Sequence, residues 1–145
     1  MTGGIPDVSE RSIAQESETA IAILTESQRV LVVAHRHADL DALGSAKGLT
    51  RALPSETAVY LPDGVASAAK PLCSGDEVRE APDTTAYDAV VVVDAPSWER
   101  IDPFSQPSHD VSTVLIDHHT TGTIYADADA AVVDTDAGAT AELVY

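Results

Sequence analysis

The chain has 145 residues, and its 24 acidic residues outnumber the eight Lys and Arg so strongly that the formal net charge is −16. This length suits a single domain with a hydrophobic core, and the 44% apolar content excludes disorder caused by a lack of apolar residues. The longest apolar runs, residues 30–34 and 89–93 among them, have five residues each, whereas a helix that spans a bilayer needs roughly 20. We therefore expect no membrane-spanning segment.

The N-terminus indicates the cellular compartment, and the single cysteine limits the kinds of site that the chain can form. The first 20 residues contain four carboxylates and no apolar stretch of the kind that secretory signals have, so a cytoplasmic protein is expected. Cys73 alone forms neither an internal disulfide nor a cysteine-rich zinc site. The acidic charge indicates a halophilic type of surface, because high salt screens the self-repulsion; a surface that mimics DNA or binds counter-ions is the alternative.

Hydrophobic periodicity predicts buried strands that alternate with helical segments. Strands are expected at residues 30–34, 58–61, 89–93 and 111–116. Helices are expected from a cap at Ser9 to about Ser27, over 43–53 with Pro54 at the end, over 65–72, and over 138–145, with a loop at 102–110. This alternation predicts an α/β fold, a mostly parallel sheet with helices on both faces.

The domain organisation follows from the same pattern. Residues 1–28 are expected to form an N-terminal helix that leads into one domain of residues 29–145. Because the last helical pattern is still running at Tyr145, this domain is expected to be incomplete at its C-terminus.

Histidines and carboxylates directly follow three of the predicted strands. Ligands of open parallel sheets bind outside the carboxyl ends of the strands, so these side chains should converge there. So many carboxylates in one cleft are costly without a cation, although Asp41 or Asp94 alone would more often cap a helix and a lone histidine is more often structural. The three clusters are His35-Arg36-His37-Ala38-Asp39-Leu40-Asp41, then Asp94, then Asp117-His118-His119.

Imidazole and carboxylate ligands without a thiolate favour Mn²⁺ or Mg²⁺, with Fe²⁺ or Co²⁺ as alternatives. Five or six ligands exceed what one catalytic ion needs, so two ions that share a carboxylate fit the count better. Such a pair, about 3.5–4 Å apart, activates a water and stabilises the attacking and leaving oxygens of a phosphoryl displacement. The predicted chemistry is hydrolysis of a phosphoester or a phosphoanhydride.

Four segments together resemble the N-terminal part of a DHH-family phosphoesterase, within the RecJ-like superfamily. They are His35-x3-Asp39-x-Asp41-Ala42-x-Gly44-Ser45, the strand 90–93 with Asp94, Leu115-Ile116-Asp117-His118-His119, and Val133-Asp134-x5-Thr140 to Tyr145. The last segment is similar to the nanoRNase and pAp-phosphatase branch, and so is the presence of Arg100 six residues after Asp94. The resemblance implies a three-layer αβα domain.

The resemblance also implies a role for each site residue. His35 and Asp39 would bind one metal ion, Asp41 and His118 the other, and Asp94 both. His119 would donate to the scissile phosphate, with Asp117 orienting the histidines. Gly44 and Ser45, at the start of the next helix, would bring backbone donors to the phosphate, and Arg36 and His37 are weaker candidates for substrate contacts.

This sequence departs from the family pattern at two places. Many members have Asn-Pro where this chain has His37-Ala38, so His37 is a spare ligand, a substrate donor or a loop residue facing solvent. The family's last metal-binding Asp and its C-terminal substrate-binding domain would lie beyond Tyr145, so these 145 residues alone are expected to be inactive. Asp134 and Asp136 are assigned to a loop and a helix cap rather than to the metals.

The expected function is a two-metal phosphoesterase that acts on short oligonucleotides, pAp or cyclic dinucleotides. The C-terminal domain is expected in the same polypeptide, and the sequence does not decide whether the protein forms a homodimer. A RecJ-like single-strand exonuclease and an inorganic pyrophosphatase are the enzymatic alternatives. Asp94 is followed by Ala95-Pro96 instead of the His-Asn of the pyrophosphatases, and no basic groove is visible for long strands. A non-catalytic nucleotide sensor is the alternative from another class.

Overall fold

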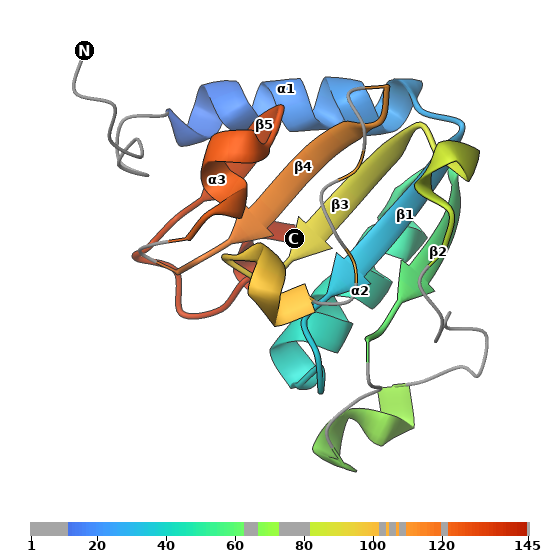
Figure 1. The fold of residues 1–145 in the computed structure, drawn as a ribbon. Helices are drawn as coiled ribbons and strands as arrows, with labels where there is room; N and C mark the ends of the chain where they lie inside the picture. The colour runs from blue at the N-terminus through green and yellow to red at the C-terminus, as the bar shows by residue number, and fades with distance from the viewer. Residues whose placement is uncertain are drawn as a thin grey trace.

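The computed structural model describes residues 12–62, 67–72, 82–101, 104, 107, 110–119 and 122–144. Five strands form one parallel sheet in the order β2-β1-β3-β4-β5 (Figure 1). The strands are β1 (Arg29–Ala34), β2 (Glu56–Tyr60), β3 (Ala89–Val93), β4 (Ser112–Asp117) and β5 (Ala130–Val133). The predicted α/β class with a mostly parallel sheet is confirmed.

The sheet order reverses between β1 and β3, which are neighbours although β2 separates them in the chain. In doubly wound sheets of this order, ligands bind at the switch point between these two strands. Ala34 pairs with Val93, and Val93 pairs with Ile116, so β1, β3 and β4 end at nearly the same level. The residues that follow these three strands therefore enter the same region of the molecule.

Helices cover both faces of the sheet, as the sequence predicts. One face packs against α1 (Ile13–Glu26), α2 (Leu40–Ala52) and the short α4 (Ala141–Val144). The other face is covered by shorter elements, α3 (Ile124–Asp127) and the 3₁₀ helix η4 (Trp98–Ile101) (Figure 1). Two further 3₁₀ helices are η2 (Ser67–Leu72) and η3 (Thr84–Ala86).

The core is built mainly from aliphatic residues, and the strands supply about half of them. All five residues of β3 are fully buried, because the strand lies in the middle of the sheet between two covering layers. Such strands read as continuous Val-rich runs rather than as alternating patterns. The four predicted strands are therefore found with small shifts of their ends.

Several predicted boundaries differ in the structure. The cap of α1 is Ser12, whose hydroxyl accepts from Gln15 N, while Ser9, Cys73 and most of residues 102–110 lie outside the described residues. In place of the predicted helix over 65–72, the structure has a 3₁₀ helix from Ser67; Pro71 inside it would clash with the carbonyl of residue i−4 in an α-helix. The fifth strand, β5, and the helix α3 were not predicted; a run of only four apolar residues between Asp129 and Asp134 was the signal for β5.

Within the described part of the chain, no helix combines the length and apolar character that crossing a membrane requires.

Candidate metal centre

His35 directly follows β1, and its ring is oriented by the backbone of its neighbour. Its Nδ1 lies 2.8 Å from the carbonyl oxygen of Arg36, and because a carbonyl only accepts, Nδ1 carries the proton. This leaves Nε2 to face two carboxylates, Asp94 Oδ2 at 3.5 Å and Asp39 Oδ1 at 3.7 Å. The hydrogen bond with Asp94 raises the pKa of His35, although burial opposes the shift. A positive charge is therefore stabilised between these three side chains.

Asp94 follows β3 and lies at the centre of the site with only 4% of its surface exposed. Its backbone has φ 59°, a left-handed conformation that Asp tolerates better than most residues. Oδ2 faces His35, while Oδ1 lies 3.2 Å from Nε2 of His118. Burial acts to raise the pKa of Asp94, but hydrogen bonds from His35 and Thr140 outweigh it and the pKa is lowered. The two carboxylate oxygens thus face imidazoles from two different strands.

Asp39 and Asp41 stand at the start of α2 and have different local roles. Asp39 is the N-cap, with Oδ1 accepting from Ala42 N at 2.9 Å. The capping role considered for Asp41 therefore belongs to Asp39. Asp41 instead accepts from the backbone N–H groups of Thr140 and Ala141, and its Oδ2 lies 3.7 Å from His118 Nε2.

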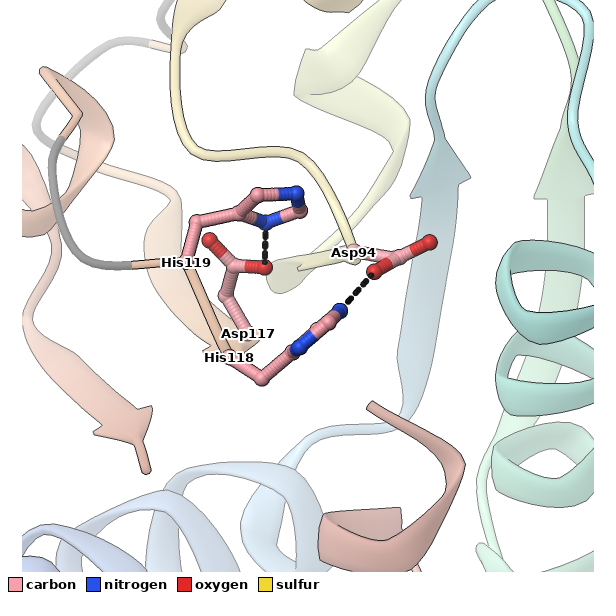
Figure 2. Close-up of side chains that lie close together, drawn as sticks. All are labelled: Asp94, Asp117, His118 and His119. Carbon is pink, nitrogen blue, oxygen red and sulfur yellow. Dashed lines mark hydrogen bonds and ion pairs between the residues drawn. The ribbon is translucent and has the colours of Figure 1, made fainter. Parts of the chain in front are cut away.

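The two imidazoles of the Asp117-His118-His119 run at the end of β4 lie close together, with ring centroids 4.7 Å apart, but contact different carboxylates (Figure 2). His118 points to Asp94, while His119 Nδ1 is hydrogen-bonded to Oδ1 of Asp117. Asp117 is almost fully buried, and this burial raises its pKa even though the bond to His119 acts to lower it. The buried carboxylate therefore holds His119, and the structure shows no such contact between Asp117 and the His118 ring.

Two groups of potential metal ligands share Asp94. One is formed by His35, Asp39 and Asp94, and within each group the ligand atoms lie within 4.8 Å of one another. The other consists of Asp94, Asp117, His118 and His119, so it includes the whole Asp-His-His run and leaves out Asp41. Imidazole nitrogen mixed with carboxylate oxygen is a donor set that fits Mn²⁺ and similar divalent ions.

The weaker substrate candidates do not join these groups. Gly44 and Ser45 were expected to open the helix, but α2 begins at Leu40, so their backbone N–H groups lie where a helix bonds them to its own carbonyls. The expected position at the start of the helix is wrong, whereas contact with the substrate stays a prediction; Ser45 is fully buried. Arg36 and His37 are exposed next to the site, and His37 has a left-handed φ of 52°.

Two further acidic residues, Asp134 and Asp136, lie in the turn that follows β5. Asp134 Oδ1 accepts from the backbone N–H of Asp136 at 2.9 Å, and neither residue belongs to a ligand group. Sequence reasoning named Thr140 only within the segment that resembles the family and missed its role in the site. Thr140 is fully buried and donates its hydroxyl to Asp94 Oδ1 at 2.9 Å. Spacing gives no signal for this contact, because the two residues are 46 positions apart.

Comparison with known proteins places the chain in a family. An exopolyphosphatase-related protein from Bacteroides fragilis has a similar fold, with a TM-score of 0.77 over 91% of this chain at 19% sequence identity. The chain spans 42% of the length of that protein. No curated protein matches the chain. The DHH family, N-terminal domain, matches residues 29–145, which include every residue of the metal centre, and the chain therefore belongs to the DHH family.

Proposed function

We propose that the whole protein is a phosphoesterase that uses two divalent metal ions. Mn²⁺ is the expected ion, with Mg²⁺ or Co²⁺ as substitutes, and the expected substrates are short oligonucleotides, pAp or cyclic dinucleotides. The observation that carries this proposal is the position of Asp94, whose two oxygens face His35 and His118 at 3.5 and 3.2 Å. A carboxylate whose two oxygens face two separate imidazoles can serve as the shared ligand of a two-metal site.

The ligand atoms that would hold the ions come from the ends of β1, β3 and β4 and from the start of α2. His35 and Asp39 lie on one side of Asp94, and His118 and Asp41 lie on the other. When bound, two such ions lower the pKa of a shared water and stabilise charge on the attacking and leaving oxygens.

His119 is proposed to bind the scissile phosphate rather than a metal ion. Its Nδ1 donates to Asp117, so Nε2 is the ring atom left to interact with substrate. When the ring is protonated, Nε2 donates a hydrogen bond that neutralises part of the charge on a phosphate oxygen.

Hydrolysis of a phosphoanhydride is the second candidate, since the structural neighbour is described as exopolyphosphatase-related. The same two-metal chemistry cleaves both bond types. A single-strand exonuclease is less favoured, because long strands need a basic groove and this chain has a net charge of −16.

A panel of substrates tests the proposal on the whole protein that contains this chain. After chelation and refilling with Mn²⁺, Mg²⁺ or Co²⁺, release of product is measured from a bis-aryl phosphodiester, a dinucleotide, pAp, pyrophosphate and a long single strand. We expect Mn²⁺-dependent hydrolysis of the first three. Equal turnover in excess chelator contradicts the two-metal mechanism, and Mn²⁺ binding without any turnover indicates a sensor. The control is Asp134→Asn, outside the ligand groups, which should leave turnover unchanged.

A further inference from the structure

We propose that Thr140 is a positioning residue that fixes the carboxylates of Asp94 and Asp41 in the orientation that binds metal. The proposal rests on the function proposed above and adds to it a residue outside the ligand set. Thr140 precedes α4 and contacts both carboxylates. Its Oγ1 donates to Asp94 Oδ1 at 2.9 Å, and its backbone N–H donates to Asp41 Oδ2 at 3.0 Å.

The hydroxyl of Thr140 does not serve its own helix. A Thr that begins a helix usually accepts, through its hydroxyl, a hydrogen bond from an N–H of the first turn. Here the hydroxyl donates to a carboxylate 46 residues away in the chain. The N–H of Ala141 also bonds to Asp41, at 2.9 Å from Oδ1. The start of α4 therefore directs three hydrogen bonds to two candidate metal ligands.

The atoms bound by Thr140 are the ones that face His118. Nε2 of His118 lies 3.2 Å from Asp94 Oδ1 and 3.7 Å from Asp41 Oδ2, the same two oxygens that accept from Thr140. A carboxylate oxygen has two lone pairs, so it accepts from Thr140 on one side and remains available to a metal ion on the other. Thr140 thus determines how Asp94 and Asp41 are presented to the ion on the His118 side.

Burial makes this hydrogen bond hard to replace. Thr140 is fully buried and Asp94 is 4% exposed, so water has little access to the oxygen when the hydroxyl is removed. Partners that orient ligands in this way typically change metal affinity 10–100-fold when they are mutated.

The test compares Thr140→Val with Thr140→Ser in the whole protein. Valine has nearly the same shape but lacks the hydroxyl, whereas serine keeps it; both keep the backbone bond to Asp41. Mn²⁺ binding by calorimetry and the Mn²⁺ concentration for half-maximal hydrolysis are measured. We expect Thr140→Val to weaken Mn²⁺ binding about 10–100-fold, with turnover partly restored by excess Mn²⁺, and Thr140→Ser to retain most of the affinity. Thr140→Ala, which also lacks the hydroxyl, replaces the valine variant if that does not fold.

The matched control is Thr113→Val, which removes a hydroxyl at another buried position, in β4. Its Mn²⁺ affinity should equal that of the wild type. Wild-type affinity in Thr140→Val overturns the role of the Thr140 hydroxyl, as does an equal loss of affinity in Thr140→Ser or in Thr113→Val. These results leave the proposed function unaffected. A wild-type protein that binds no Mn²⁺ overturns the proposed function and this role with it.

Discussion

Asp117 holds the imidazole of His119 through the ring's Nδ1 atom, and Asp117 itself is only 2% exposed to solvent. An ionised carboxylate only accepts hydrogen bonds, so the proton of the neutral ring lies on Nδ1. Asp117 therefore sets both the tautomer of His119 and the direction of Nε2.

Replacement of Asp117 by Asn is expected to reduce turnover by about 10–100-fold, as loss of an orienting partner commonly does. Asn has the same size, but its amide also offers N–H donors that favour the wrong tautomer of His119. Mn²⁺ affinity should change less than kcat, because His119 is proposed to contact substrate. Steady-state kinetics at saturating Mn²⁺ check this, and a loss of metal binding with kcat unchanged would contradict it.

Asp94 gives a sharper test, because two variants distinguish the loss of its carboxylate from the strain in its backbone. Asp94→Asn keeps the side-chain size and tolerates the left-handed φ of 59°, whereas Asp94→Ala strains it. Both variants should lose more than about 100-fold in turnover, beyond the usual effect of a supporting residue. Thermal melts should show the Ala variant to be the less stable of the two. Near-wild-type turnover in Asp94→Asn would refute the shared-ligand role.

The site could be predicted from the sequence where polar residues follow strongly apolar strands. Residues 89–93 are a run of buried residues between two aspartates, so both the strand and the position of Asp94 were evident. The opposite holds for the bond from Thr140 to Asp94 and for the bonds that Asp41 accepts from Thr140 and Ala141. Those contacts depend on how α4 returns to α2, which is a matter of tertiary packing and leaves no periodic signal in the chain.

Gly122 is expected to be intolerant of any side chain. A Cβ at this position would lie 2.1 Å from the carbonyl oxygen of Pro96, a backbone atom that cannot move away cheaply. Gly122→Ala should destabilise the protein by about 1–3 kcal/mol, as overpacking typically does. Gly44→Ala is the matched control, because its Cβ meets nothing within 4 Å inside α2, and it should stabilise by about 0.5–1 kcal/mol. Denaturant unfolding measures both; equal effects would contradict the argument.

The net charge of −16 predicts that stability rises with salt. Self-repulsion among carboxylates is screened as ionic strength increases, because the Debye length falls to about 3 Å at 1 M. Melting temperatures from low to molar KCl should therefore increase. A double variant of the exposed α1 residues, Glu18→Gln with Glu26→Gln, should show a smaller increase. A flat or falling melting temperature in the wild type would leave the halophilic interpretation without support.

Asp88 predicts a specific loss of stability in acid. Its Oδ2 accepts from the backbone N–H groups of Arg29 and Gln28, at 2.9 and 2.7 Å, and so ties the start of β1 to the residue before β3. The hydrogen bond from Arg29, followed by that from Gln28, lowers the pKa of Asp88 below its ordinary value. A carboxyl whose pKa is lower in the folded state stabilises the fold above the unfolded-state pKa of about 3.9, and this contribution disappears as the pH falls through the folded-state pKa.

The variant Asp88→Asn should therefore melt at a lower temperature than the wild type at pH 7, and the difference should shrink as the pH falls below about 4. Melting curves at pH 7, 5 and 3 measure this difference. The control is Asp136→Asn, an exposed residue in the turn after β5 that ties no strands together. Its melting temperature should follow the wild type at every pH. A difference between Asp88→Asn and the wild type that stays constant from pH 7 to pH 3 would show that the charge of Asp88 is not its cause. No difference at pH 7 would show that the neutral amide oxygen holds the two N–H groups equally well.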